Sequence, residues 1–178
     1  TSRTIGQVKV DALRDHLLEI NPEANITAYQ KIYQAETAEE FHMEEYDFII
    51  DAIDSLKDKA DLILRATALP KEITFVSSMG AALRRDPFMV RKAEFWKVDG
   101  DPLARALRKK FKKNKTFPRR KFQCVFSEEK PMQNMSDQRL VEDEWTSTKP
   151  QINGSLCHIT ATFGMAIAGI VINHIIER

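Results

Sequence analysis

The residues best suited to chemistry in this sequence are two aspartates, Asp51 and Asp54, which closely follow the apolar run Phe48–Ile50. The run has no period-2 alternation, which indicates a strand buried on both faces of a parallel sheet. Ser55 and Asp58 then have the S-x-x-D spacing of a helix capping box. Ligands of open α/β sheets bind beyond the carboxyl ends of such strands, so both carboxylates are placed to bind a nucleotide or a metal ion. The alternative is that Asp54 only helps to cap the helix and Asp51 is an edge residue.

The elements that must position these carboxylates form a strand–helix–strand pattern. Residues 55–69 have apolar positions at a helical period, and Pro70 ends the helix. Residues 73–78 read as a second strand, followed by the small-residue turn at 79–82. This order predicts a right-handed parallel crossover. We therefore expect an α/β, Rossmann-like fold with a mainly parallel sheet flanked by helices.

The segment before this unit predicts one longer helix and two shorter elements. A helix is expected from Thr4 or Gly6 to about Ile20, with apolar side chains on one face. Residues 25–33 have β character, and the acid-rich residues 35–43 predict a short surface helix.

The chain changes character after Gly80. The expected elements are a strand at 88–96, a helix at 103–113 that starts after Asp101-Pro102, a strand at 122–126, a polar loop at 128–150 and a closing apolar helix from 159. The last helix is short for a bilayer span and carries polar residues, so we expect it to be buried in the core. We therefore expect one domain, residues 1–178, with a Rossmann-like part at 1–80 and a mixed extension at 81–178.

Composition limits the classes of function. The 178 residues suit one domain, and the net charge of +1 implies no acidic or basic partner for the chain as a whole. Its two cysteines form no C-x-x-C pair, which argues against a zinc site or a disulfide framework and favours a cytoplasmic setting. The glycine-rich turn G-x-G-x-x-G, typical of nucleotide sites in such sheets, does not occur in the sequence.

Residues 105–121 form a dense basic block without acids, in which Phe111 and Phe117 are interleaved and which Phe122 follows. Such a block favours binding to a phosphate backbone, although a lysine-rich helix is commonly just a solvated face. The candidate RNA-binding residues are Arg105, Arg108, Lys109, Lys112, Arg119 and Arg120.

Three groups of motifs resemble a known superfamily. The motifs are Ile5-Gly6-Gln7-Val8-Lys9 with Ile20-Asn21-Pro22, then Asp51-Ala52-Ile53-Asp54-Ser55, and finally Asp101-Pro102-Leu103-Ala104, Cys124-Val125-Phe126-Ser127-Glu128 and Thr160-Ala161-Thr162-Phe163-Gly164. The first two groups resemble the ubiquitin-activating-enzyme-like adenylyltransferases. The third group resembles the branch of tRNA threonylcarbamoyladenosine dehydratases.

The resemblance implies an ATP-dependent enzyme that adenylates a carboxylate on tRNA and closes it into a cyclic form. Lys9 matches the family's phosphate-contacting lysine, and Asp54 matches the acid that works with ATP and Mg²⁺; both are the expected catalytic residues. Asp51 matches the first acid of the pair. Arg84 and Arg85, in the loop after the second strand, are further phosphate candidates. Carboxylate oxygens are the ligands Mg²⁺ prefers, and a lysine at a helix start suits phosphate.

The sequence also departs from the family pattern. The family's glycine-rich turn, its ribose-binding acid and an arginine lie upstream of where this chain begins, so we expect a fragment of a longer parent that binds ATP weakly and is inactive alone. The expected partners are tRNA and a second subunit, with no membrane and no DNA.

Three alternatives remain open at this point. The parent could activate a ubiquitin-like sulfur carrier, although such relatives usually carry zinc-binding C-x-x-C pairs. The chain could also be a non-catalytic half that supplies dimer or RNA contacts. Finally, Cys124 or Cys157 could act as a thiol nucleophile, with His158 beside Cys157, although Cys124 lies in an expected buried strand.

Overall fold

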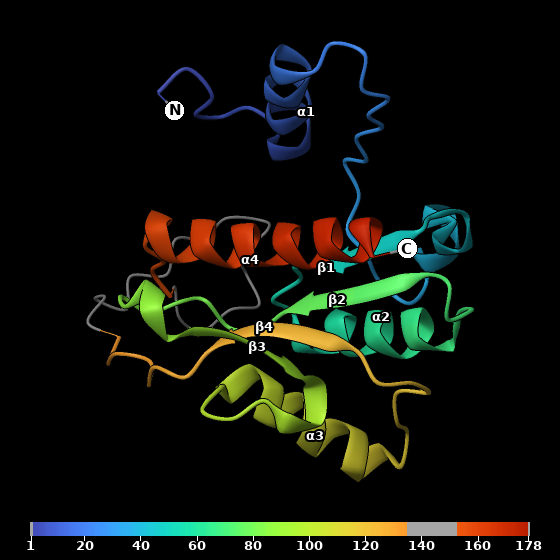
Figure 1. The fold of residues 1–178 in the computed structure, drawn as a ribbon, viewed down its shortest axis with the longest axis vertical. Coiled ribbons are helices and arrows are strands. Elements are labelled where there is room, and N and C mark those ends of the chain that lie inside the picture. The colour runs from blue at the N-terminus through green and yellow to red at the C-terminus, as the bar shows by residue number, and fades with distance from the viewer. Residues whose placement is uncertain (1, 135–152, 178) are drawn as a thin grey trace.

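The structure, a computed structural model, describes residues 2–134 and 153–177 as a four-stranded sheet between two layers of helices (Figure 1). In the order β1-β2-β4-β3, the strands are β1 (Phe48–Asp51), β2 (Thr74–Ser78), β4 (Gln123–Ser127) and β3 (Val90–Glu94). β1, β2 and β4 are parallel, and β3 is antiparallel to β4 at the edge. Helices α2 (Leu56–Ala68) and α3 (Pro102–Asn114) cover one face, and α4 (Cys157–Ile176) covers the other. The expected α/β, mainly parallel fold is confirmed.

Local sequence signals explain where the helices begin. The Ser55 hydroxyl accepts a hydrogen bond from the Asp58 backbone N–H at 3.5 Å and donates to Asp58 Oδ2 at 2.6 Å, so Ser55 is the N-cap of α2. The Asp101 carboxylate accepts one from Ala104 N at 2.8 Å, and Pro102 occupies the first position of α3. Lys115, in the left-handed region at φ 51°, ends α3.

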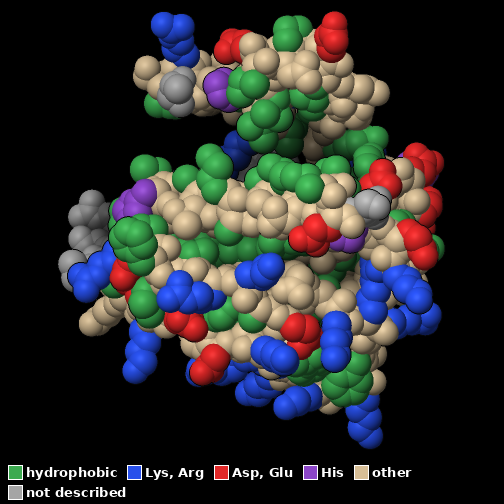
Figure 2. Space-filling model, in the orientation of Figure 1, with side chains coloured by type: hydrophobic (Ala, Val, Ile, Leu, Met, Phe, Trp, Pro, Cys, Tyr) green, Lys and Arg blue, Asp and Glu red, His purple; other side chains and the backbone are tan. Residues whose placement is uncertain are grey.

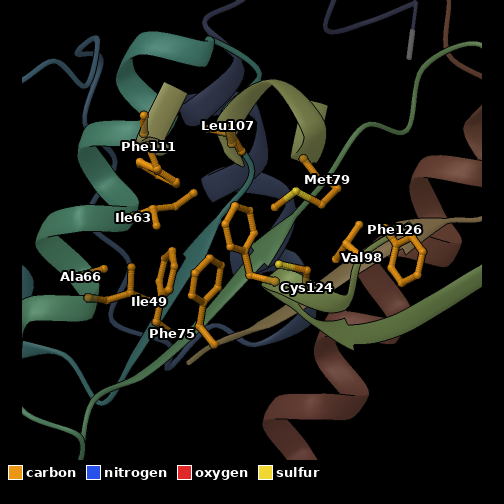
Figure 3. Packing of buried hydrophobic residues seen from close by; sticks show 14 of the residues in the cluster. Ile49, Ile63, Ala66, Phe75, Met79, Val98, Leu107, Phe111, Cys124 and Phe126 are labelled. Carbon is orange, nitrogen blue, oxygen red and sulfur yellow. The ribbon is translucent and has the colours of Figure 1, made fainter. Parts of the chain in front are cut away.

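The larger core lies between the sheet and the α2–α3 layer. Figure 3 shows Ile63 and Ala66 of α2 and Leu107 and Phe111 of α3 directed toward side chains of the strands, among them Phe75 and Cys124. The Phe95 ring stacks on Phe122 at 5.0 Å between centroids. This aromatic packing holds the edge strand and the basic helix in one body.

Helix α4 packs on the opposite face along one stripe. Ile159, Phe163 and Ile167 are buried against Val76 and Val125 of the central strands. The rest of the helix is largely exposed, so the expected burial holds for this stripe only. By length and hydropathy α4 is also the one candidate membrane span among the described residues, a test that core helices of soluble proteins pass as well.

Helix α1 (Lys9–Ile20) has no buried residue, and Figure 1 shows it standing apart from the three layers, on the side of α4. It begins later than the expected start at Thr4 or Gly6. Its exposed apolar side chains include Leu13 and Ile20. The predicted helix is therefore present, but it contributes nothing to the core of this structure.

Two expected elements differ in the structure. Residues 24–34 form neither helix nor strand, so the β character assigned to 25–33 was wrong. Side chains hold the end of this segment, because Tyr33 donates to Asp61 at 2.9 Å and Arg65 donates to the Ala35 carbonyl at 3.1 Å. The acid-rich helix is two short 3₁₀ turns, Ala38–Phe41 and Met43–Glu45.

The strand expected at 88–96 is shorter because carboxylates cap a 3₁₀ turn at each end of it. Asp86 accepts from Phe88 N at 2.9 Å, and Glu94 accepts from Trp96 N at 3.2 Å. These local hydrogen bonds replace ladder bonds and confine β3 to Val90–Glu94. The polar loop expected at 128–150 lies mostly outside the described residues.

Candidate functional site

The carboxyl ends of the three parallel strands meet at one edge of the sheet. β1 ends at Asp51, β2 at Ser78 and β4 at Ser127, and Asp51 is paired in register with Ser77. The turns that follow carry Asp54, the Gly80–Arg85 loop and Glu129. Parallel strands place ligand-binding groups at this edge, and most of the predicted cofactor-binding residues come from it.

Asp51 is fully buried, and three groups of the protein bind its oxygens. Lys59 Nζ lies 2.7 Å from Oδ2, and the Ser77 hydroxyl donates to the same oxygen at 2.6 Å. The Ile53 backbone N–H donates to Oδ1 at 3.0 Å. A buried carboxylate with these partners orients the turn that leads to Asp54.

Lys59 and Ser77 were missed in the sequence, although Lys59 carries a signal. It falls on the apolar stripe of α2 that includes Ala60 and Ile63, where an unpaired ammonium would be costly. A lysine at that position predicts a buried carboxylate partner nearby.

Asp54 is exposed at the start of the turn into α2. Ser55, the next residue, is the N-cap of the helix, so Asp54 is not the capping residue. An exposed carboxylate directly beyond the end of β1 has oxygens of the kind that Mg²⁺ binds. The location of Asp54 suits metal binding, and this role stays a prediction.

Arg84 is almost fully buried beside Asp101, with its Nη2 atom 3.4 Å from Asp101 Oδ2. Its Nε and Nη1 atoms are buried and have no hydrogen-bond partner within residues 2–134 and 153–177. The Gly80 backbone N–H donates to the same Asp101 oxygen at 3.1 Å, and a Cβ atom on Gly80 would lie 3.2 Å from it. Glycine at position 80 therefore lets the β2–loop turn approach the cap of α3.

Burial shifts the pKa of both members of this pair. It lowers the pKa of the Arg84 guanidinium, although the negative charge of Asp101 acts to raise it. Burial raises the pKa of Asp101 above its usual range, although the Ala104 N–H and Arg84 oppose the shift. Asp101 was predicted only as part of a helix start, and nothing in the sequence indicated its contact with Gly80.

Arg85 is exposed, and the backbone at this position is fixed by Glu129 from the end of β4. Glu129 Oε2 accepts from Arg85 N at 2.9 Å and from Asp86 N at 3.0 Å. Burial alone would raise the pKa of Glu129, but these two N–H groups and Arg84 lower it below its ordinary value. The Arg85 carbonyl is 2.9 Å from His158 Nε2, which ties the loop to the start of α4.

Lys9 is exposed at the first residue of α1, as its predicted role at a helix start requires. Because α1 stands apart from the layers, the structure does not bring Lys9 onto the edge of the sheet that carries Asp54 (Figure 1). Its proposed contact with phosphate therefore stays a prediction.

The basic block divides into exposed and anchored residues. Arg105, Lys109 and Lys112 are exposed along α3, whose Leu107 and Phe111 face the core. Figure 2 shows lysine and arginine side chains gathered over the part of the molecule that contains α3. This exposed face of the helix suits contact with phosphates.

Of the other three basic candidates, Arg108 and Arg120 make structural contacts through their side chains. Arg108 donates to the Phe95 carbonyl at 3.1 Å, and Arg120 donates to the Ala66 and Ile73 carbonyls at 3.2 and 2.5 Å. Arg119 is exposed, and its backbone N–H donates to Thr67. Arg120 therefore attaches the loop before β4 to α2 and to the residue that precedes β2.

The aromatic residues of the block are arranged differently from the expectation. Phe111 and Phe122 are buried in the core, and Phe117 is 52% exposed. Of the three rings interleaved with the basic residues, only Phe117 is therefore in a position to meet RNA.

The cysteines lie in different environments. Cys124 is fully buried in β4, and burial raises the pKa of its thiol far above the usual value. Cys157 is exposed at the first residue of α4. A buried neutral thiol is inert, so a role for Cys124 as a nucleophile is contradicted by its surroundings.

The opposite edge of the sheet has a cavity of about 580 Å³ between the start of β1, the start of β2 and α4. Its lining includes Glu44, Asp47, Glu72 and His174. Nearby, His42, Glu44 and Glu45 bring possible ligand atoms within 4.8 Å of one another, but all three are exposed. Neither feature involves a predicted site residue.

The comparisons with known proteins agree with the sequence motifs. The chain is 35% identical over 136 residues to the tRNA threonylcarbamoyladenosine dehydratase of Bacillus subtilis, covering 76% of this chain and 52% of that protein. It is 30% identical over 190 residues to the protein of that name from Haemophilus influenzae, covering 99% and 69%. The resemblance to this branch is thereby confirmed.

Solved structures give the same result for the fold. The crystal structure of the Escherichia coli tRNA N6-threonylcarbamoyladenosine dehydratase in complex with AMP matches with a TM-score of 0.76 at 26% identity, covering 97% of this chain and 65% of that one. The complex of that enzyme with ATP also matches with a TM-score of 0.76. The chain thus spans about half to two thirds of the length of these relatives. Because the model of the ThiF family matches residues 1–178, the chain belongs to the ThiF family.

Proposed function

We propose that this chain is part of a longer, cytoplasmic enzyme that uses ATP to dehydrate threonylcarbamoyladenosine in tRNA. The observation that carries the proposal is its likeness, over 99% of its residues, to a Haemophilus protein named for that activity. The match to an Escherichia coli enzyme of the same name with ATP bound supports the use of ATP.

The proposed reaction balances as two substitutions. An oxygen of the threonyl carboxylate attacks the α-phosphorus of ATP, and pyrophosphate leaves. A carbamoyl heteroatom then attacks the activated carbonyl carbon and loses its proton, and AMP leaves with the oxygen that had attacked. The nucleoside closes into a ring and has lost one water, while ATP has become AMP and pyrophosphate.

The residues at the carboxyl edge of the sheet fit an anionic nucleotide. Arg84 has two buried nitrogen atoms without a hydrogen-bond partner among the described residues, and the Arg85 side chain is 73% exposed in the same loop. Asp54 would hold Mg²⁺ against the phosphates, which reduces their repulsion of the attacking carboxylate. Lys9 would neutralise phosphate charge at the N-terminus of α1 once that helix approaches the sheet.

Asp51 has a positioning role in this proposal. Its oxygens are bound by Lys59, Ser77 and Ile53, so it fixes the turn from which Asp54 projects.

Substrate tRNA would meet the exposed face of α3, where Arg105, Lys109 and Lys112 neutralise backbone phosphates. A homodimer remains part of the proposal. The 178 residues contain no G-x-G-x-x-G turn, and we expect this chain alone to bind ATP weakly and to have no turnover.

The experiment that tests the proposal is tRNA-dependent exchange of pyrophosphate into ATP by the longer parent protein. Exchange measures reversible adenylation, so it should require tRNA that carries threonylcarbamoyladenosine. Asp54→Asn should abolish exchange. Asp47→Asn is the matched control because Asp47 precedes the same strand at the opposite edge of the sheet, and it should leave exchange unchanged. Exchange supported by a small carrier protein instead of tRNA would overturn the proposal.

A further inference from the structure

Two large aromatic side chains that belong to no core lie together on the surface. Trp96 is 39% exposed and Phe117 is 52% exposed. Their ring centroids are 6.2 Å apart, and their planes are tilted by 42°. Exposed aromatic surface costs free energy in water, and a pair of neighbouring exposed rings often marks a binding surface.

The fold holds both rings on rigid supports. Trp96 lies in the 3₁₀ turn Phe95–Lys97, and its ring packs edge-on against Phe95 at 5.2 Å. Phe95 is itself fully buried. Phe117 follows the end of α3, where Thr116 N donates to the Phe111 carbonyl at 3.1 Å. The two rings are therefore preorganised, and a ligand would meet them with little loss of conformational entropy.

Several basic residues lie near this pair, together with the Glu94 carboxylate, which accepts from Trp96 N at 3.2 Å. Lys97 follows Trp96 in the chain, and Lys115 lies two residues before Phe117. Arg108 reaches the Phe95 carbonyl, directly beside Trp96, at 3.1 Å. Arg105, Lys109 and Lys112 are exposed on α3, the helix that also carries Arg108.

We propose that Trp96 and Phe117 form a platform on which unpaired bases of an RNA stack while the basic face of α3 binds the backbone. The inference rests on the proposed function, since it names the part of this chain that would receive the single-stranded region of tRNA. Unpaired bases stack on aromatic side chains, and neighbouring cations bind the phosphates. Within double-stranded RNA each base face is covered by the neighbouring pair, except at the two ends, so the body of a duplex would use the cations alone.

Indole fluorescence provides the first test. The chain has two tryptophans, so the variant Trp145→Phe leaves Trp96 as the only one. An RNA hairpin with a single-stranded loop should quench this fluorescence because a stacked base contacts the indole. A blunt duplex with the sequence of the hairpin stem should bind without comparable quenching.

Affinity measured by anisotropy with labelled RNA provides the second test. Phe117→Leu keeps an apolar side chain but removes the stacking face, and it should weaken hairpin binding about tenfold or more. Binding of the duplex should be unchanged. Phe88→Leu is the matched control, since Phe88 is exposed at the other end of β3, and it should leave both affinities unchanged. Trp96→Phe should retain most of the hairpin affinity, whereas Trp96→Leu should not.

The outcomes separate this inference from the proposed function. The platform is overturned if Phe117→Leu leaves the affinity for the hairpin unchanged and the hairpin does not quench the fluorescence of Trp96. This outcome leaves tRNA as a substrate. Loss of self-association in the variants, seen by sedimentation, would assign the rings to a contact between copies and would also overturn it. No affinity for either RNA would contradict both proposals.

Discussion

Lys59 Nζ lies 2.7 Å from Asp51 Oδ2, and both side chains are fully buried. Lys59 also donates to the Ile53 carbonyl at 3.0 Å, so one ammonium joins the end of β1 to the turn that follows it. The pair therefore holds the backbone from which Asp54 projects, and its loss would affect both stability and the candidate site.

Lys59→Ala should destabilise the protein by about 3–5 kcal/mol, because it leaves the Asp51 carboxylate buried without its counter-charge. Urea unfolding measures this change. Lys57→Ala, an exposed position on the same helix, should change stability by less than about 0.5 kcal/mol. The double variant Asp51→Leu/Lys59→Met should be more stable than Lys59→Ala. A cost for Lys59→Ala below about 1 kcal/mol, as at an exposed ion pair, would contradict the buried pair.

The two thiols should react very differently. At pH 8 an alkylating reagent should modify Cys157, which is exposed, and leave Cys124 unmodified, because burial raises the pKa of the Cys124 thiol and excludes the reagent. Mass spectrometry should find one modified cysteine in the folded protein and two in urea. Rapid modification of Cys124 in the folded protein would be inconsistent with its position in β4.

Arg120 should behave as a structural residue although it belongs to the basic block. Its guanidinium donates to the Ala66 and Ile73 carbonyls, so Arg120→Ala should lower the free energy of unfolding by about 1–3 kcal/mol. Lys121→Ala, next to it and exposed, should cost less than about 0.5 kcal/mol. Lys112→Ala should instead affect RNA binding. It should reduce by about one the slope of the logarithm of the RNA association constant against the logarithm of the salt concentration. Equal stability of Arg120→Ala and Lys121→Ala would refute the assignment.

Glu129 should make the protein sensitive to acid. Its pKa is lowered in the folded state, so the carboxylate contributes stability above its unfolded pKa and loses it as the pH falls through the folded pKa. The variant Glu129→Gln keeps an acceptor oxygen without the charge. At pH 7 the urea midpoint of the unsubstituted chain should exceed that of the variant. This difference should shrink as the pH falls below 4.5, the ordinary pKa of a glutamate. A difference independent of pH would show that the charge contributes nothing.

Local signals in the sequence were sufficient for the elements that carry the site. The apolar run at Phe48–Ile50 predicted β1, and the Ser55–Asp58 spacing predicted the start of α2. The expected burial of β1 on both faces was wrong, because Ile50 is 43% exposed. Both signals depend on hydrogen bonds or burial within a few residues. The same is true of Asp101-Pro102 at the start of α3, so these predictions did not require knowledge of the tertiary fold.

The features that were missed depend on contacts between distant segments. Lys59 reaches Asp51 across the strand–helix turn, and Glu129 binds backbone N–H groups of a loop 43 and 44 residues away. The β character of residues 25–33 was overridden because Tyr33 and the following turn attach to α2 through side chains. Periodicity along the chain does not identify the partners in such pairs, although the place of Lys59 on the apolar stripe of α2 indicates a buried carboxylate nearby.

The most direct test of the proposed activity is nucleoside mass spectrometry on tRNA incubated with Mg-ATP. The arms are this chain, the longer parent protein, and the parent protein with Asp54→Asn. We expect threonylcarbamoyladenosine to lose one water with the parent protein and to stay unchanged with the other two. Unchanged nucleoside in the presence of the longer parent protein would contradict the proposed function. Full conversion by the Asp54→Asn variant would contradict the role of Asp54.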